Sequence, residues 1–374
     1  MINKNRLVKL TQRLIQINSQ NPGSDEFQIA RFLKDYFAKA GLRAKIYEFK
    51  KRRTNLVATL KTNKQKHSLL ISPHLDTVPA GTNWSIPPFS GRIYKDRIYG
   101  LGATDCKGNL ACAIEALNSL IEDRVVLGYN LILAATADEE SGSSLGLIPF
   151  LEKGILKPDA ALILDADEFN IIITQKGLLH LKVKIQGKRA HGAYPWLGIN
   201  AIDIAIHILK DLKVHKISRL KNRYLKPATM NIGTIRGGDR VNVVADWCEF
   251  ELDFRFLPGD SAAEILKYLK SVIRKYTDKF KIEIEGIQKP YCIERNHALV
   301  NYLIKAMQGL KVRPQIKGSE GATVITFFQN KNIPAIATGF GKEGCAHSVD
   351  EYIEIESLYK GALVLERFLK LYHF

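Results

Sequence analysis

Residues 69–76 read Leu69-Leu70-Ile71-Ser72-Pro73-His74-Leu75-Asp76, a continuous apolar run that ends in a histidine and an aspartate. Strands that are apolar on both faces are typical of a parallel sheet covered by helices on both sides. Similar runs occur at 131–135, 160–164 and 333–337. We therefore expect four buried strands in one sheet.

Helical periodicity surrounds these runs. Apolar residues spaced three and four apart predict helices at 7–17, 29–37, 110–121, 299–307 and 358–369. Strands that alternate with helices predict the α/β class, with a doubly wound, mostly parallel sheet. Such a sheet binds ligands beyond the carboxyl ends of its strands, so a functional site is expected there.

The pattern changes near residue 178. From 179 to 185 apolar residues alternate with His and Lys, as in strands with one face in solvent. Further strands are expected near 230–235, 243–256 and 280–287, with helices at 201–212 and 265–273. This order predicts an inserted α+β, ferredoxin-like unit. The predicted domains are 178–288 for the insertion, and 1–177 with 289–374 for a split catalytic domain.

Composition excludes several classes of protein. The 374-residue chain has 55 Lys and Arg against 38 Asp and Glu, a formal net charge of +17. These basic residues are spread along the chain without a nucleic-acid-binding motif, so we expect no nucleic-acid partner. No apolar run approaches the roughly 20 residues of a membrane span, and no signal peptide is visible. We expect a cytoplasmic protein without a membrane partner or, given five cysteines, a disulfide framework.

Titratable side chains follow each of the four apolar runs, and one more precedes the helix predicted at 110–121. In chain order they are His74, Asp76, Asp105, Asp138, Glu139, Glu140, Asp165, Asp167 and His347. So many carboxylates at one edge of a sheet repel one another unless a cation lies between them. Mixed imidazole and carboxylate ligands suit zinc, with cobalt or manganese as possible substitutes. The residues alone therefore predict one or two divalent metal ions.

Three alternatives fit the sequence less well. The pattern Gly100-x-Gly102-x-x-Asp105 looks like a truncated dinucleotide fingerprint, but it lacks the third glycine and would face a pyrophosphate with an aspartate. No Gly-x-Ser-x-Gly elbow supports a serine hydrolase. Cys106 and Cys345 lie close to the candidate ligands in sequence, but dinuclear hydrolytic sites more often use nitrogen and oxygen donors.

Five motifs occur in order along nearly the whole chain, at 72–79, 102–108, 138–142, 190–195 and 346–352. Together they resemble the zinc-dependent amidohydrolase and peptidase family that includes acetylornithine deacetylase, succinyl-diaminopimelate desuccinylase, aminoacylase-1 and carboxypeptidase G. The resemblance implies two zinc ions about 3.5 Å apart. It also implies that the inserted domain is a lid, which commonly mediates dimerisation, so a homodimer is expected.

The resemblance implies which side chains hold the metal. His74 and the acid after the third strand would bind one ion, Glu140 and His347 the other, and Asp105 would bridge both. The third-strand ligand departs from the Gly-Glu-Pro found in many relatives, since Asp165 and Asp167 are both available. Asp165 is preferred because it directly follows the strand, and Asp167 is the alternative.

The remaining roles also come from the resemblance. Glu139 would be the general base, and Asp76 would orient His74 through the second nitrogen of the imidazole. His191 would stabilise the oxyanion, often in the partner subunit's site. Asn242 and Arg255 would contact substrate, with Arg255 pairing with its carboxylate.

The implied function is that of a dinuclear zinc hydrolase. It would cleave the amide bond of an N-acyl amino acid or a short peptide, as a deacetylase, desuccinylase or carboxypeptidase does. The loop at 318–323 differs from the Gly-Thr-Asp-Ala type of many relatives, so specificity is not transferable from any one member. The alternative is a catalytically inactive relative that binds a metal or ligand, although every proposed metal position is intact.

Overall fold

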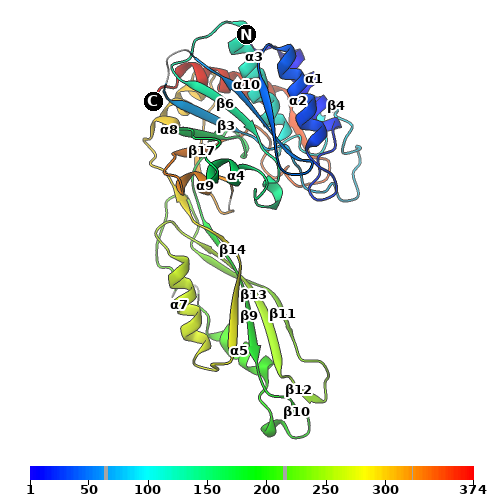
Figure 1. Cartoon of the computed structure of the whole chain (residues 1–374), viewed down its shortest axis with the longest axis vertical. Helices are drawn as coiled ribbons and strands as arrows, with labels where there is room; N and C mark the ends of the chain where they lie inside the picture. The colour runs from blue at the N-terminus through cyan, green and yellow to red at the C-terminus, as the bar shows by residue number, and fades with distance from the viewer. Residues whose placement is uncertain (63–65, 214–216, 322) are drawn as a thin grey trace. The chain divides into compact units, whose positions relative to one another are not determined.

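The computed structural model describes residues 1–62, 66–213, 217–321 and 323–374 (Figure 1). The chain forms two compact units. The first comprises Met1–Ile173, Ile293–Lys317 and Phe327–Phe374, and the second comprises Thr174–Cys292 and Gly318–Thr326. The segment Gly318–Thr326, which includes the undescribed Ala322, thus groups with the second unit, whereas the sequence pattern assigns it to the catalytic domain.

The central sheet of the first unit has a parallel core. Its strands lie in the order β1 (Ala44–Lys50), β2 (Arg53–Leu60), β6 (Asn130–Ala135), β3 (Ser68–Ser72), β7 (Ala160–Ile163), β17 (Ala335–Ala337) and β8 (Ile171–Gln175). Neighbouring strands from β6 to β17 run parallel, and they are the four strands that the sequence predicts. β2 and β8 join this core antiparallel. The predicted mostly parallel sheet is confirmed.

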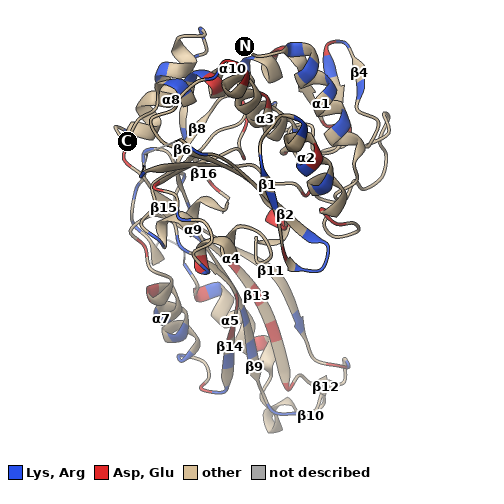
Figure 2. Ribbon diagram, turned by 45° about the horizontal axis from the view of Figure 1, so that its top comes forward, with Lys and Arg blue, Asp and Glu red and all other residues tan. Residues whose placement is uncertain are grey.

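Helices lie on both sides of this sheet, with α3 and α10 on one side and α4 on the other (Figures 1 and 2). The helices of the first unit, with α9 spanning its boundary, are α1 (Lys4–Gln16), α2 (Phe27–Lys39), α3 (Lys107–Glu122), α4 (Leu147–Glu152), α8 (Ala298–Gln308), α9 (Ile325–Gln329) and α10 (Ile355–Leu371). α3 is buried along most of its length, so its polar side chains as well as its apolar ones lie in the interior. Among the described residues, no helix is both long and apolar enough to cross a membrane.

Short strands complete the first unit. β4 (Arg92–Tyr94), β5 (Arg97–Tyr99) and β18 (Tyr352–Glu354) form a small antiparallel sheet. β16 (Ile316–Ser319) pairs with β8, and the last residues of β8 pair with β15 (Tyr291–Cys292). β18 directly precedes α10 and follows the segment that contains His347.

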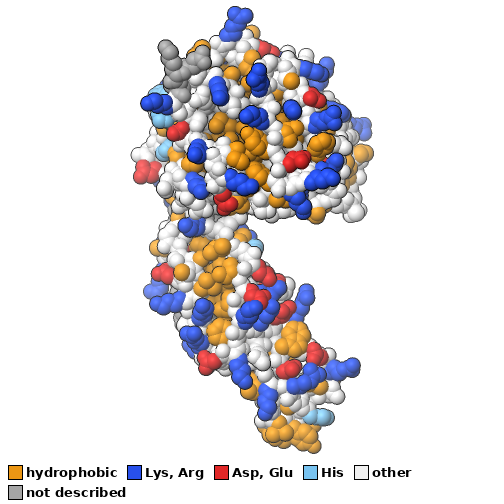
Figure 3. Space-filling model, viewed as in Figure 1, with side chains coloured by type: hydrophobic (Ala, Val, Ile, Leu, Met, Phe, Trp, Pro, Cys, Tyr) orange, Lys and Arg blue, Asp and Glu red, His pale blue; other side chains and the backbone are white. Residues whose placement is uncertain are grey.

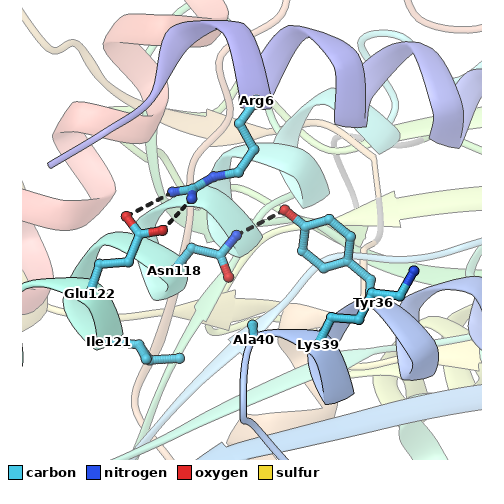
Figure 4. A pocket seen from close by; sticks show the side chains of 7 residues that line it. All are labelled: Arg6, Tyr36, Lys39, Ala40, Asn118, Ile121 and Glu122. Atoms are coloured by element: carbon cyan, nitrogen blue, oxygen red, sulfur yellow. Dashed lines mark hydrogen bonds and ion pairs between the residues drawn. The ribbon is translucent and has the colours of Figure 1, made fainter.

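A pocket of about 280 Å³ lies among α1, α2 and α3 (Figure 4). Arg6 of α1 pairs there with Glu122 of α3, and with Glu115, whose side chain is fully buried. Asn118 donates a hydrogen bond to the hydroxyl of Tyr36 at 3.0 Å. These contacts tie the amino-terminal helices to the buried helix α3, and none of the predicted site residues lines the pocket.

The second unit is a four-stranded antiparallel sheet with two helices. The strand order is β11 (Thr229–Gly237), β13 (Trp247–Phe256), β9 (Gly177–Gln186) and β14 (Phe280–Gln288). Apolar residues of alternate positions form one core with α5 (Ala201–Asp211) and α7 (Ala262–Ile273). The alternation in the sequence therefore predicts these strands correctly.

One predicted strand of this unit is wrong in its extent. The chain from 243 to 256 is not continuous, because β12 (Val243–Val244) pairs with β10 (Ala190–His191) and β13 begins only at Trp247. Between them, the carbonyls of Ala245 and Asp246 accept hydrogen bonds from Ala201 and Gly187, both at 2.8 Å. These contacts draw the backbone away from the sheet.

The face of the second unit's sheet that does not meet the helices carries ion pairs, and we call it the charged face. Lys182 lies 2.9 Å from both Glu251 and Glu285. Glu283 lies 2.9 Å from Lys184 and 2.8 Å from Lys281. In the ribbon of Figure 2, positions of acidic and basic residues are coloured along the strands of this sheet.

Candidate metal centre

Four of the predicted metal ligands meet at the carboxyl edge of the parallel strands. His74 follows β3, Glu140 follows β6, His347 follows β17, and Asp105 precedes α3. Nε2 of His74 is 2.8 Å from Oδ1 of Asp105, and Nε2 of His347 is 3.2 Å from Oδ2 of the same carboxylate. His347 Nε2 is also 3.0 Å from Glu140 Oε1. Asp105 therefore offers one oxygen to each histidine.

Within the described residues, two groups of three side chains are close enough to hold a metal ion. One group is His74, Asp105 and Cys106, and the other is Asp105, Glu140 and His347. In each group the candidate ligand atoms lie within 4.8 Å of one another. Imidazole nitrogens and carboxylate oxygens form a donor set that fits a divalent ion such as zinc. Because Asp105 belongs to both groups, the geometry fits a pair of ions.

The tautomer of His74 suits metal binding. Its Nδ1 is 2.9 Å from the backbone carbonyl oxygen of Asp76. A carbonyl oxygen only accepts, so Nδ1 carries a proton, and Nε2 on the side of Asp105 is the nitrogen that would be left to bind a metal ion. The Asp76 carboxylate lies farther away, with Oδ1 3.7 Å from Nδ1. The backbone of Asp76, rather than its side chain, makes the orienting hydrogen bond.

The Asp76 carboxylate instead supports the neighbouring acids. Its two oxygens accept hydrogen bonds from the backbone N–H groups of Glu139 at 3.1 Å and Glu140 at 3.2 Å. Asn21 donates a third hydrogen bond to it at 3.1 Å. Asp76 is fully buried, and this contact fixes the turn that follows β6. From the sequence, Asp76 is expected only to orient His74. Its hydrogen bonds to the turn that follows β6 are not predicted.

A buried network behind this turn was also missed. Arg53 pairs with Glu26 and with Asp138, the residue before Glu139. Asp138 has a left-handed φ of 65° without being glycine, and its carboxylate accepts the Leu145 N–H at 3.0 Å. Burial, together with the negative charge of Asp76, raises the pKa of Glu26 to about 7 despite the pairing with Arg53. The positions of Glu139 and Glu140 thus depend on residues from three distant segments.

Two further acids at this edge lack an ion-pair partner among the described residues. Burial and the negative charge of Asp165 raise the pKa of Glu139 well above its ordinary value. Burial and the charge of Asp105 raise the pKa of Asp165 to about 7. Neither residue belongs to the two groups of three described above. Their surroundings favour an uncharged carboxyl unless a cation is present.

The structure separates the two candidates for the third-strand ligand. The charge of Asp105 and those of the two candidate ligand histidines act on Asp165. Asp167 instead faces Glu168 and Glu343, and Asn170 donates a hydrogen bond to it at 3.3 Å. Only Asp165, of these two, shares the electrostatic environment of Asp105.

Cys106 lies beside His74 rather than in solvent. Its sulfur accepts a hydrogen bond from the backbone N–H of His74 at 3.1 Å. Burial raises the pKa of the Cys106 thiol to about 12, despite the nearby imidazole of His74. The contact holds the backbone of a candidate ligand, a role that sequence analysis does not suggest.

Glu351 is a further buried residue of this site. It lies within the motif at 346–352, but the sequence predicts no role for it. It is 1 % exposed and follows His347 by four positions. Its carboxylate accepts hydrogen bonds from backbone N–H groups of the loop before Asp105. Its position in the motif at 346–352 is the feature of the sequence that could have indicated a role. The contacts of its carboxyl group depend on the conformation of the loop.

The three predicted substrate-contacting residues lie in the second unit. Asn242 is next to His191, because the Gly192 N–H donates to the Asn242 carbonyl at 2.8 Å. Nδ1 of His191 accepts the Ala193 N–H at 3.0 Å, so the neutral ring carries its proton on Nε2. Figure 3 shows an apolar patch at the end of this unit where β10 and β12 lie. It includes the exposed side chains of Tyr194, Trp196 and Leu197.

Arg255 lies on the charged face, away from the His191 loop. Its Nε donates to Asp253 at 2.9 Å, and Nε2 of His180 is 3.4 Å from the same carboxylate. No hydrogen bond to a described residue engages the two terminal nitrogens of Arg255. The guanidinium is therefore fixed through Nε, with its remaining donors available to an anion.

Comparison with known proteins decides the family. Residues 70–371 match the model of peptidase family M20/M25/M40. The chain belongs to this family. The deacetylases, desuccinylase, aminoacylase and carboxypeptidase that its motifs resemble fall within the same family, so the resemblance is confirmed. The M20 chain is accordingly a metal-dependent hydrolase of amide or peptide bonds.

Individual relatives cover nearly the whole M20 chain. An uncharacterized metallohydrolase of Methanocaldococcus jannaschii is 29% identical, over 97% of this chain and 98% of its own. The aminopeptidase PepT from Bacillus cereus has a TM-score of 0.82 at 22% identity, over 99% of this chain and 98% of its own. A tripeptidase from Staphylococcus aureus has a TM-score of 0.80 at 25% identity, with the same coverage of 99% and 98%.

Proposed function

We propose that this M20 chain is a dinuclear zinc hydrolase that cleaves the amide bond of a short peptide or an N-acyl amino acid. The observation that carries the proposal is the position of Asp105, whose two oxygens lie 2.8 Å and 3.2 Å from His74 and His347. A carboxylate between two imidazoles, at an edge with further unpaired acids, fits a ligand shared by two cations.

In this proposal the ligands divide into two sets around Asp105. His74 and Asp165 hold one ion, and Glu140 and His347 hold the other. When bound, the ions supply a Lewis acid for the substrate carbonyl and lower the pKa of a nearby water. Cobalt or manganese are possible substitutes for zinc, because the same nitrogen and oxygen donors suit them.

Glu139 is the proposed general base. Burial raises its pKa, so its carboxylate accepts a proton more readily than a solvent-exposed glutamate does. It takes the proton from the attacking water and later delivers it to the leaving amine. The Asp76 carboxylate holds the Glu139 backbone, which keeps the base in place between these two transfers.

Residues of the second unit are proposed to bind the substrate. Nε2 of His191 carries the proton in the neutral ring and donates it as a hydrogen bond to the oxyanion. The terminal nitrogens of Arg255 bind the substrate carboxylate, and Asn242 contributes a further polar contact. A homodimer formed through this unit, and a cytoplasmic location, remain predictions.

Two of the structural relatives are an aminopeptidase and a tripeptidase, which favours a peptide over an N-acyl amino acid as the substrate. The test is an activity screen of the zinc- and cobalt-loaded protein against dipeptides, tripeptides, N-acetyl and N-succinyl amino acids. We expect amide hydrolysis that a chelator abolishes and that zinc restores. If the metal-loaded protein binds two ions but hydrolyses no member of these classes, the catalytic proposal fails and the inactive alternative stands.

A further inference from the structure

The loop that presents Asp105 is held by a single buried carboxylate. Oε1 of Glu351 accepts the backbone N–H groups of Thr104 at 2.7 Å and Asp105 at 3.0 Å. Oε2 accepts the N–H of Gly102 at 2.8 Å. Three backbone N–H groups thus share one buried carboxyl group as their acceptor, and its loss would leave these buried donors unpaired.

The loop has little freedom to compensate for the loss of these bonds. Gly102 has a left-handed φ of 82°, and a Cβ there would lie 2.8 Å from the side chain of Thr77. The hydroxyl of Thr104 donates to the backbone carbonyl of Tyr352 at 2.7 Å. Residues 351 and 352 together therefore provide the partners that a neighbouring strand would otherwise supply.

Glu351 also connects this loop to the other half of the site. It lies four residues after His347, which contacts both Asp105 and Glu140. The Gly100 N–H donates to the Glu351 carbonyl at 2.8 Å, so both its backbone and its side chain join the two segments. Moving one segment without the other would separate His347 from the carboxylate it shares with His74.

We propose that Glu351 is a positioning residue that holds Asp105 and His347 in register, and so sets the affinity for both metal ions together. The inference rests on the proposed function, since it assumes that these side chains bind metal. Glu351 itself binds backbone N–H groups and is not a ligand. Its substitution should therefore weaken the binding of both ions rather than abolish the binding of one.

The neighbouring residue provides a matched control. Asp350 accepts the backbone N–H groups of Ser85 at 2.9 Å and Ile86 at 3.2 Å, and the Ser85 hydroxyl at 2.6 Å. Asp350 thus makes the same kind of contact from the same segment. The loop that it holds contains none of the candidate metal ligands.

The experiment compares Glu351→Gln and Asp350→Asn with the unsubstituted protein. Cobalt is titrated into each metal-free protein and followed by visible absorption, with the bound ions counted by elemental analysis. We expect Glu351→Gln to lower the affinity for both ions by about 10- to 100-fold. Asp350→Asn should change either affinity by less than about threefold. A folded Glu351→Gln protein that binds both ions as tightly as the unsubstituted protein overturns the inference, whatever its thermal stability.

The unsubstituted protein separates the two proposals. If it binds no cobalt and no zinc, the proposed function fails. If Glu351→Gln does not fold, amide hydrogen exchange of the unsubstituted protein decides, because coupling between loop and metal is reciprocal. Metal should then increase protection of the Gly102, Thr104 and Asp105 amides and leave those of Ser85 and Ile86 unchanged. Equal exchange of the first set with and without metal overturns the inference.

Discussion

The metal centre of the first unit and the charged face of the second both gather carboxylates, but they balance the charge differently. On the charged face Glu283 pairs with Lys184 and Lys281, and their hydrogen bonds lower its pKa to about 2. At the metal centre, burial and the charge of Asp105 raise the pKa of Asp165 to about 7. The charged face is thus neutralised by the chain's own lysines. The candidate metal centre has acids that no lysine or arginine of the described residues pairs with, and their carboxyls favour the uncharged form unless a cation is present.

Glu139 lies among the acids of the candidate metal centre, but its proposed role is to transfer protons rather than to bind metal. Substituting Glu139→Ala should lower turnover by about 10²- to 10⁴-fold, because the general base is lost. Metal content, measured by elemental analysis, should stay at the unsubstituted level. Retained activity would remove Glu139 from the mechanism, and lost metal would make it a ligand instead.

Replacing the Asp165 carboxylate by a neutral amide should weaken metal binding but stabilise the metal-free protein. Asp165→Asn should weaken metal binding by at least about tenfold, since a ligand is lost. The metal-free protein should become more stable by about 1–2 kcal/mol, because the cost of burying the Asp165 carboxylate and its repulsion from Asp105 both disappear. Denaturant unfolding with a chelator measures the second effect.

Asp167→Asn is the control for that substitution, because Asp167 lies in the same segment but faces other charges. Its metal affinity should match that of the unsubstituted protein. The assignment of the third-strand ligand reverses if Asp167→Asn weakens metal binding and Asp165→Asn does not.

Arg255 marks the part of the charged face where a guanidinium keeps unpaired donors. Asp253 is shared by Arg255 and by His180, so an anionic substrate would find unpaired donors there. Arg255→Lys should raise KM about tenfold with a smaller change in kcat, because Lys does not form the two-pronged contact with a carboxylate. An unchanged KM for every carboxylate-bearing substrate would exclude this role.

The smallest effect is expected at Glu283. Its pKa is lowered in the folded protein, so its stabilising contribution is present above its ordinary pKa of 4.5 and is lost as the pH falls toward 2. Glu283→Gln should lower Tm at pH 7 by roughly 1–2 °C. This difference should vanish in acid, as thermal unfolding at a series of pH values would show. A Glu283→Gln protein that is more stable than the unsubstituted one at pH 7 would contradict the comparison.

Much of the fold follows from hydrophobic periodicity. The runs at 69–72, 131–135 and 160–164 become β3, β6 and β7, because a strand covered on both faces needs no polar residues. The hairpin of β1 and β2 was not predicted, since β1 is partly exposed and the buried strand β2 includes the polar residues Thr54 and Asn55. The break between β12 and β13 was missed because it depends on hydrogen bonds to residues far away in the chain.

The meeting of the candidate metal ligands was predictable because topology places the carboxyl ends of parallel strands together. His74, Glu140 and His347 each follow such a strand, so their meeting needs no knowledge of side-chain conformation. The supporting residues follow no such rule. Glu351 and Arg53 act through loop backbones and buried ion pairs whose partners are set only when the loops have folded.

The most direct test of the account is the number of zinc ions bound per chain before and after the substitution Asp105→Asn, measured by calorimetric titration of the metal-free protein. We predict two ions for the unsubstituted chain and a large loss of affinity for both in the Asp105→Asn protein, because each ion depends on the shared carboxylate. A single ion in the unsubstituted chain, or two ions that bind the Asp105→Asn protein with unchanged affinity, would contradict the account.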